Sequence, residues 1–295
     1  MDFIVQLIIN GVSLGCIYAL LALGFVIIFK ASGVINFALG EFMALGAYIC
    51  VTLLSQYHVP LIPAALLTMG FAVIMGLTVE RVMLRPLIGE SIISVIMVTL
   101  GLAAMLKALI IMVFGVKALE YPSLVSDEPW FEWESVFIDN IYVIVVIATA
   151  VCIVSLTFFF KRTRYGNAMR AVANDQIAAQ SMGMNVGRLF ALAWSIMAIL
   201  TALGGFLLGA QSGLQVGIVH TGLRVFPVVI LGGLDSIVGA ILGGIIIGLL
   251  ETFSSVYLGD YFAGNVGEVT AFVGLIVILM IKPFGLFGTE EIEKL

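Results

Sequence analysis

The stretch Phe226-Pro-Val-Val-Ile-Leu-Gly-Gly-Leu-Asp-Ser-Ile-Val-Gly-Ala-Ile-Leu-Gly-Gly244 decides the fold of this chain of 295 residues. It belongs to an apolar run, residues 222–258, that is too long for one simple membrane crossing, because a helix needs roughly 20 residues to cross about 30 Å of hydrocarbon. An acid, Asp235, interrupts this run, and the glycines before it let the backbone turn. The pattern predicts a discontinuous helix that breaks between Gly232 and Ser236.

The rest of the chain has the composition of a membrane protein. Hydrophobic residues make up 62% of the sequence and charged residues 11%, whereas soluble domains average about 45–50% and about 25%. Further apolar runs of spanning length cover residues 3–29, 34–54, 59–79, 92–114, 141–160, 189–210 and 266–281. These runs predict an all-α, polytopic membrane protein with about eight transmembrane helices plus one broken or re-entrant helix. We expect residues 1–295 to form a single transmembrane domain.

Basic residues set the expected orientation in the membrane. The densest group lies between the runs 141–160 and 189–210 and consists of Lys161, Arg162, Arg164, Arg170 and Arg188. Because cytoplasmic loops carry an excess of Lys and Arg, this segment is predicted to be cytoplasmic. Alternation of the spans then places the acidic loop 115–140 outside, together with Lys117 and Arg224. The N-terminus is predicted to be outside and the C-terminus cytoplasmic.

Polar residues within the apolar runs are the candidates for a substrate pathway: Asn36, Glu41, Asp235, Ser236 and Glu251. A carboxylate at bilayer depth costs about 2.5–3.5 kcal/mol, so these groups are expected to face protein or water. Asn36, read as a helix cap, and Glu41 precede a glycine-rich apolar helix, and Asp235 does the same in the second half of the chain. That likeness is typical of an internal inverted repeat. Alternatively, Asp235 is a solvated residue in a tight turn at the cytoplasmic surface.

The inner segment 161–187 has the pattern of two short helices. Gly166 and Asn167 can open the first, Asn174 or Asp175 can cap the second, and Gly183 can close it. Its alanines leave a weakly polar surface, which favours a helix that docks on a partner protein. The candidate coupling residues are Gly166, Arg170, Ala171, Asp175, Ala179 and Gly183. The alternative is a basic loop that only sets the topology.

Catalytic patterns are missing from the sequence. Gly11-Val-Ser-Leu-Gly15 matches the nucleophile pattern of hydrolases, but it lies in the first apolar run and no strand precedes it. No phosphate-binding loop, paired-cysteine metal motif or zinc-helix motif occurs. We therefore expect no catalytic residue, no metal site, no cofactor and no nucleic-acid partner.

Motifs along the chain, in order, resemble those of one family, the permease subunits of branched-chain amino acid ABC transporters. Asn36-Phe-Ala-Leu-Gly-Glu41 is similar to that family's Asn-Phe-Ala-His-Gly-Glu. Arg170-Ala-Val-Ala173, with Gly183 after it, resembles its cytoplasmic coupling segment, and Lys282-Pro-Phe-Gly-Leu-Phe-Gly288 its C-terminal motif. Leu231-Gly-Gly-Leu-Asp-Ser-Ile-Val-Gly-Ala240 is similar to its glycine-rich break. Leu39, Asp235 and Val238 depart from the usual His, Gly and Pro, so the role of the family's histidine does not transfer.

The resemblance implies a multi-pass permease subunit of an ABC importer in a prokaryotic cytoplasmic (inner) membrane. It would translocate branched-chain amino acids with ATP hydrolysed by separate subunits. Its implied partners are a second, homologous permease chain, two cytoplasmic ABC ATPases and an extracytoplasmic solute-binding protein, in contact with the lipid bilayer.

Two alternatives stay open at the level of sequence. One is a permease for another small solute, such as urea, an amide or other amino acids. The other is an ion-coupled secondary transporter in which Glu41, Asp235 and Glu251 are proton or cation sites.

Overall fold

The computed structural model describes residues 2–119, 121, 130–133, 136–174, 176–262, 266–283 and 285–288. Its helices are α1 (Asp2–Ser32), α2 (Leu39–Ser55), α3 (Leu61–Val79), α4 (Ile92–Phe114), α5 (Asn140–Arg162), α6 (Arg164–Asn174), α7 (Gln176–Ser181), α8 (Val186–Ser212), α9 (Thr221–Gly232), α10 (Ile237–Tyr257) and α11 (Val266–Ile281). A π-helical turn, η1 (Glu80–Leu84), and a 3-10 turn, η2 (Arg85–Leu87), extend α3, and a second 3-10 turn, η3 (Val216–His220), precedes α9. Strands β1 (Phe131–Trp133) and β2 (Val136–Ile138) form an antiparallel hairpin. The prediction of an all-α, polytopic fold is confirmed.

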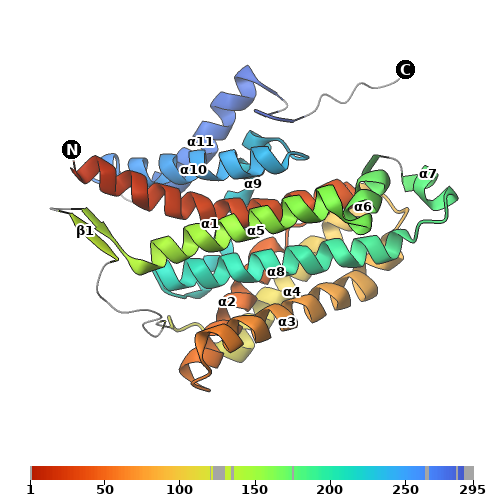
Figure 1. Cartoon of the computed structure of the whole chain (residues 1–295), viewed down its shortest axis with the longest axis horizontal. Coiled ribbons are helices and arrows are strands. Elements are labelled where there is room, and N and C mark those ends of the chain that lie inside the picture. The colour runs from red at the N-terminus through yellow and green to blue at the C-terminus, as the bar shows by residue number, and fades with distance from the viewer. Residues whose placement is uncertain are drawn as a thin grey trace.

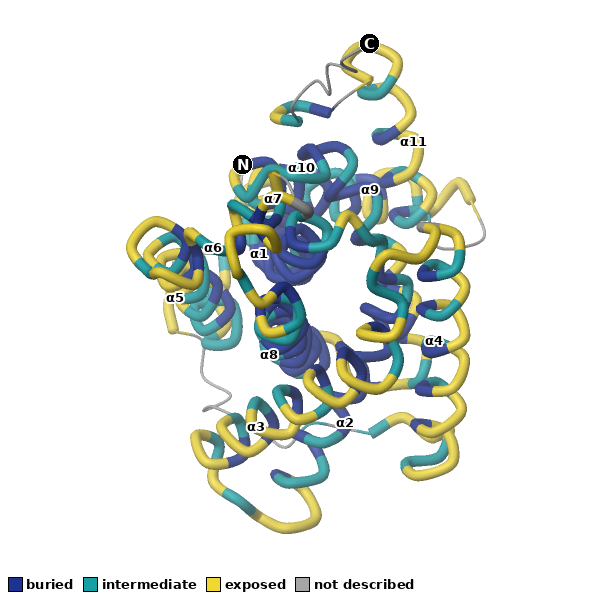
Figure 2. The backbone as a smooth tube through the Cα atoms, turned by 90° about the vertical axis from the view of Figure 1, so that its right-hand side faces the viewer, coloured by how far each residue is buried: buried dark blue, intermediate teal, exposed yellow. Residues whose placement is uncertain are grey.

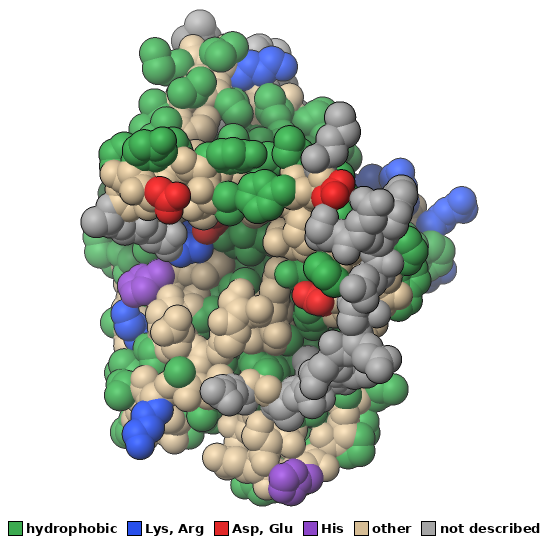
Figure 3. Space-filling view, turned by 90° about the vertical axis from the view of Figure 1, so that its left-hand side faces the viewer, with side chains coloured by type: hydrophobic (Ala, Val, Ile, Leu, Met, Phe, Trp, Pro, Cys, Tyr) green, Lys and Arg blue, Asp and Glu red, His purple; other side chains and the backbone are tan. Residues whose placement is uncertain are grey.

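Six helices in the described part of the chain are long and apolar enough to cross a membrane: α1, α3 with its extension to Leu87, α4, α5, α8 and α10. Shorter apolar helices are Leu39–Ser55, Val216–Gly232 and Val266–Ile281. Figure 1 shows the N-terminus and β1 at one end of the bundle, called the hairpin end below, and α6 and α7 at the opposite end, the α6–α7 end. Figure 3 shows the hairpin end, where charged side chains and histidines are scattered among hydrophobic ones.

Helices α1 and α8 form the centre of the bundle. In their most apolar windows, 78% and 72% of the residues are buried, against 28%, 28% and 22% in α3, α4 and α5. Figure 2 shows the same contrast, with α1 and α8 largely dark blue and the outward sides of α3, α4 and α5 yellow. Large apolar side chains such as Ile62, Met112 and Val154 are exposed on the outer helices. A chain that faces lipid has no need to hide such residues, so this surface fits a hydrocarbon surrounding.

Glycines let α1 and α10 pack backbone against backbone. A Cβ atom added at Gly248 of α10 would lie 2.4 Å from the backbone nitrogen of Gly15 in α1. One added at Gly15 would lie 2.7 Å from the Cα of Ile245. Small residues four apart align on one helical face and allow this approach, which supplies the van der Waals contact that holds helices together in lipid.

The first break in the bundle lies before α2 and corrects the expected span 34–54. The helix begins only at Leu39, and residues 33–38 contain no helix. Asn36 Oδ1 accepts a hydrogen bond of 3.0 Å from the backbone N–H of Ala38, two residues on. This local bond offers the backbone an alternative to the helix, so the chain enters α2 through a turn. Asn36 therefore lies ahead of the helix cap, which is Ala38.

The second break matches the prediction from the sequence. Helix α9 ends at Gly232 and α10 begins at Ile237. Gly233 has φ +107°, a conformation that favours glycine. Ser236 caps α10, because its Oγ accepts a hydrogen bond of 3.0 Å from the N–H of Gly239.

The α1–α10 contact predicts opposite effects for two glycine substitutions. Gly248→Ala places a methyl group against the backbone of Gly15, and we expect a loss of about 1–3 kcal/mol from overpacking. Gly101→Ala in α4 meets open space, so we expect no loss and up to about 1 kcal/mol of gain from helix propensity. Thermal unfolding of the detergent-solubilised protein measures both. Equal unfolding temperatures for the two variants would contradict the packing argument.

Candidate functional site

The two short helices α2 and α9 start at the same place inside the bundle. A Cβ added at Gly222 of α9 would lie 2.4 Å from the Cα of Gly40 in α2. One added at Gly40 would lie 2.3 Å from the carbonyl oxygen of Val219. Beside this crossing, the rings of Phe37 and Phe226 pack with their centroids 5.1 Å apart. Because the first N–H groups of a helix lack intrahelical partners, the crossing gathers polar backbone within an apolar bundle.

Asn36 and Glu41 lie on the α2 side of this crossing. Asn36 is fully buried, and its Nδ2 has no hydrogen-bond partner among the described residues. Glu41, in the first turn of α2, is 7% exposed, and the positive charge of Lys107 on α4 acts on its carboxylate. A buried amide donor and a buried carboxylate near a helix start are groups that a polar solute or water can bind.

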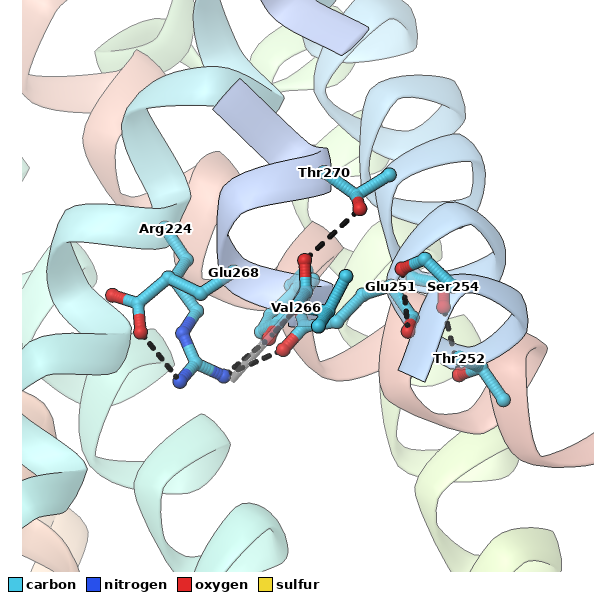
Figure 4. Close-up of polar contacts among 9 residues, drawn as sticks. Arg224, Glu251, Thr252, Ser254, Val266, Glu268 and Thr270 are labelled. Atoms are coloured by element: carbon cyan, nitrogen blue, oxygen red, sulfur yellow. Dashed lines mark hydrogen bonds and ion pairs between the residues drawn. The ribbon is translucent and has the colours of Figure 1, made fainter. Parts of the chain in front are cut away.

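Glu251 lies at a second place, in a buried ion cluster that joins four helices (Figure 4). Its Oε1 lies 2.6 Å from Nη1 of Arg224, and its Oε2 accepts a hydrogen bond of 2.6 Å from the hydroxyl of Tyr18. Arg224 Nη2 also lies 3.4 Å from Oε2 of Glu268. The side chains of Arg224 and Glu251 are only 18% and 8% exposed. The cluster ties α9 to α10, α11 and α1.

Arg224 has a role that was not predicted from the sequence. Its expected place on the exterior side, which followed from the alternation of the spans, stays a prediction, and the structure makes it a member of the buried cluster. Sequence reasoning also missed Tyr18 and Glu268 as partners of Glu251. One signal was present: an acid inside an apolar run needs a compensating charge, and Arg224 is the only Lys or Arg in residues 189–281. The spacing of 27 residues between Arg224 and Glu251 does not by itself place them together.

Asp235 and Ser236 lie at a third place, the turn between α9 and α10. The carbonyl oxygen of Asp235 accepts a hydrogen bond of 3.4 Å from Nζ of Lys30, at the end of α1. Lys30 belongs to the α6–α7 end, because α1 begins at the opposite end. Asn36 and Glu41 therefore flank the start of α2, Glu251 is paired with Arg224 of α9, and Asp235 and Ser236 form the turn that joins α9 to α10.

The segment after α9 is pinned by the chain beyond α11. The N–H groups of Leu286 and Phe287 donate hydrogen bonds of 2.8 and 3.0 Å to the carbonyls of Leu231 and Gly232. These carbonyls end α9 and have no intrahelical partner. The C-terminal motif therefore satisfies the end of the broken helix.

Two of the coupling candidates are buried against the bundle. A Cβ added at Gly166 would lie 2.4 Å from the carbonyl oxygen of Phe159 in α5, so a glycine is needed where α6 packs on α5. Ala179 of α7 is 5% exposed. These two residues hold the α6–α7 pair in place and do not reach its outer surface.

Other coupling candidates are accessible from outside. Arg170 is exposed and donates a hydrogen bond to Asn167 one turn earlier, and Ala171 is half-buried. Gly183 is exposed, meets no neighbouring atom and has φ +80°. Asp175 lies outside the described residues. Among the coupling candidates, Arg170, Ala171 and Gly183 therefore contribute to the accessible surface of this pair.

Comparison with known proteins gives a consistent result. The family described as "Branched-chain amino acid transport system / permease component" matches residues 7–281. The chain is 32% identical to the high-affinity branched-chain amino acid transport system permease protein BraD of Pseudomonas aeruginosa, over 98% of this chain and 97% of BraD. It is also 32% identical to LivH of Escherichia coli, over 99% and 98%, and 25% identical to LivM of the same organism, over 93% and 68%.

One solved structure is similar in fold. The chain aligns with PsaBC from Streptococcus pneumoniae in complex with Fab, with a TM-score of 0.52 and 16% identity, over 96% of this chain and 93% of that one. At this level of identity the likeness concerns the arrangement of helices alone.

The ion cluster makes a prediction about stability. Arg224→Met leaves Glu251 buried without its cation, and we expect a loss of about 3 kcal/mol, the low end for a broken buried pair because Arg224 keeps some exposure. Arg224→Met combined with Glu251→Met removes both charges, so most of the loss should be recovered. Denaturant or thermal unfolding of the two single variants and the double variant measures the coupling. Simple additivity of the two losses would rule out the pairing.

Proposed function

The chain belongs to the family of branched-chain amino acid transport system permease components, and on that premise we propose that it is the membrane-spanning permease subunit of an ABC importer for these amino acids. The observation that carries the proposal beyond family membership is the α6–α7 pair. It is a pair of short helices that packs on α5 at Gly166. Arg170 of α6 and Gly183 after α7 are exposed at the α6–α7 end of the bundle. An ATPase subunit needs such a surface, because the force of nucleotide closure reaches the spans only through it.

The proposed orientation places the α6–α7 end in the cytoplasm. Lys30 lies at this end, and the guanidinium of Arg85 lies beside Gly187 at the start of α8. Arg164 and Arg170 lie in α6, and Arg188 lies in the first turn of α8. A concentration of basic residues is typical of the cytoplasmic side, so the N-terminus would be outside and the C-terminus inside.

The proposed partners follow from the lack of a nucleotide-binding motif in the sequence and from the family. A second permease chain would complete the pathway, and the likeness to both LivH and LivM supports a homologous partner rather than an identical one. Two cytoplasmic ATPases would bind the α6–α7 surface, and an extracytoplasmic solute-binding protein would deliver the substrate at the hairpin end.

In the proposed mechanism the pathway opens and closes by movement of α2 relative to α9 at their crossing. Movement of α6 is passed to α5 through the close contact at Gly166, and movement of α7 is passed to α8, which follows it in the chain. Helix α8 packs on α2, because the backbone of Met43 fills the space beside Gly205. Rocking of these helices would shift α2 against α9 at Gly40 and Gly222, and so change which end of the bundle is open.

The substrate class has a direct test. We expect unlabelled leucine, isoleucine and valine to compete with labelled leucine for uptake by the assembled transporter, and urea not to compete. Competition by urea, or the absence of leucine uptake, would favour a permease for another small solute. Uptake by this chain alone, driven by an ion gradient without ATP, would overturn the importer in favour of a secondary transporter.

The coupling surface makes its own prediction. Arg170→Glu reverses the charge of an exposed residue, and Gly183→Val forces a β-branched residue into a left-handed conformation. We expect both variants to insert and fold but to lose at least tenfold in ATP-driven uptake, with ATP hydrolysis no longer stimulated by substrate. Uptake by the assembled transporter and its ATPase rate, measured together, report the uncoupling.

Arg162→Glu at the end of α5 is a matched control, since it reverses an exposed charge outside the α6–α7 pair. It should keep uptake near the level of the unmodified protein. Normal transport by both the Arg170 and the Gly183 variants would show that the ATPases act elsewhere.

A further inference from the structure

A cavity of about 250 Å³ lies at the α6–α7 end of the bundle, apart from the α2–α9 crossing and the ion cluster. Its walls include Val34, Leu84, Glu90, Val95, Gln176 and Trp194. At about 30 Å³ per water molecule, the space equals roughly eight waters, which is the size of one free amino acid with a branched side chain.

The cavity is lined by residues from the segment before α2 and from the α6–α7 pair. Val34 lies in the non-helical segment before α2, and Gln176 is the first residue of α7. Leu84 ends the π-helical turn η1, and π-helical turns often mark functional positions in helices. Trp194 lies on α8, which follows α7 in the chain. A molecule in this cavity would contact both the non-helical segment before α2 and the α6–α7 pair.

The lining has an apolar floor and a polar rim. Leu84, Val95 and Trp194 are 9%, 7% and 3% exposed and form the floor. Glu90 is exposed and Gln176 half-buried at the rim, and no described residue of the lining is basic. Burial of an aliphatic side chain on the floor, with the ammonium group beside Glu90 and the amide of Gln176 as donor to the carboxylate, matches this arrangement.

We propose that this cavity binds the transported branched-chain amino acid from the cytoplasm, and that its occupation slows import. The inference rests on the proposed function, which supplies both the ligand and the cytoplasmic orientation. A ligand shifts a conformational equilibrium only by its differential affinity for the two states. An amino acid held between Val34, Val95 and Gln176 links α7 to the segment before α2, so it stabilises the arrangement described here against movement of the α6–α7 pair.

The test uses the assembled transporter in proteoliposomes, with ATP inside and labelled leucine delivered from outside. Two initial rates are measured, that of leucine uptake and that of ATP hydrolysis. Each rate in the presence of internal leucine is divided by the same rate in its absence. For the unmodified protein we expect this ratio to fall severalfold as internal leucine rises. The ratio is independent of each variant's basal rate.

Three variants locate the effect. Val95→Trp fills the floor of the cavity, and its ratio should stay near one at all concentrations of internal leucine. Met97→Trp adds the same side chain to the same helix at a position that is 61% exposed, and its ratio should match that of the unmodified protein. Should Val95→Trp fail to fold, Glu90→Gln at the exposed rim should require severalfold more internal leucine for the same inhibition.

Each other outcome overturns the inference. Normal leucine uptake that internal leucine does not slow would remove the cavity site while leaving the proposed function intact. Unchanged inhibition in the Val95 or the Glu90 variant would place the inhibition elsewhere. A transporter that takes up no leucine even without internal leucine would refute the proposed function, and this inference with it.

Discussion

The interior of a bilayer offers no water to an exposed peptide group, and the breaks before α2 and between α9 and α10 are built around that constraint. Before α2, the side chain of Asn36 holds the N–H of Ala38. Between α9 and α10, Ser236 holds the N–H of Gly239, and the segment after α11 covers the last carbonyls of α9. Each break is thus closed by its own hydrogen bonds. The breaks are defined structures, and they leave polar groups only where two helices begin.

Small residues decide where helices approach and therefore where they can slide. The contact between Gly40 and Gly222 has no side chain on either helix, so the two backbones touch. The ion cluster of Arg224, Glu251 and Glu268, by contrast, fixes α9 to its neighbours with charge. Helix α9 is therefore held to α10 and α11 by charge, while at Gly40 and Gly222 its contact with α2 is made by backbone alone. A pathway that opens by relative movement requires this difference between a rigid side and a sliding side.

Features that depend on residues close together in the chain, such as helical spans and helix breaks, were predicted well from the sequence. Composition and run length predicted the all-α bundle, and the glycines before Asp235 predicted the break that ends α9 at Gly232. The start of α2 was misplaced by about one turn, because Asn36 was read as a helix cap and its side chain instead holds a turn ahead of the cap. Apolar periodicity does not distinguish the two, since the residues after Asn36 are apolar in either case.

Contacts between segments that are distant in the chain could not be predicted from the sequence. Tyr18 and Glu251 are separated by 233 positions, and only the packing of α1 on α10 brings them within hydrogen-bond distance. The same limit applies to the ion pair of Arg224 with Glu251, because only the packing of α9 beside α10 brings the two side chains together. A single sequence states that a buried acid needs a partner, but it does not state which helix provides it.

The glycine contact between α1 and α10 also constrains how the protein is made. Helix α1 leaves the ribosome more than 200 residues before α10, against which its glycines pack. Until α10 is made, Gly11 and Gly15 lack this partner, and α1 must stay inserted on its own hydropathy, which reaches 2.5 in its most apolar window. The high apolar content of α1 thus serves an early stage of biogenesis, before its partner helix exists, as well as the centre of the finished bundle.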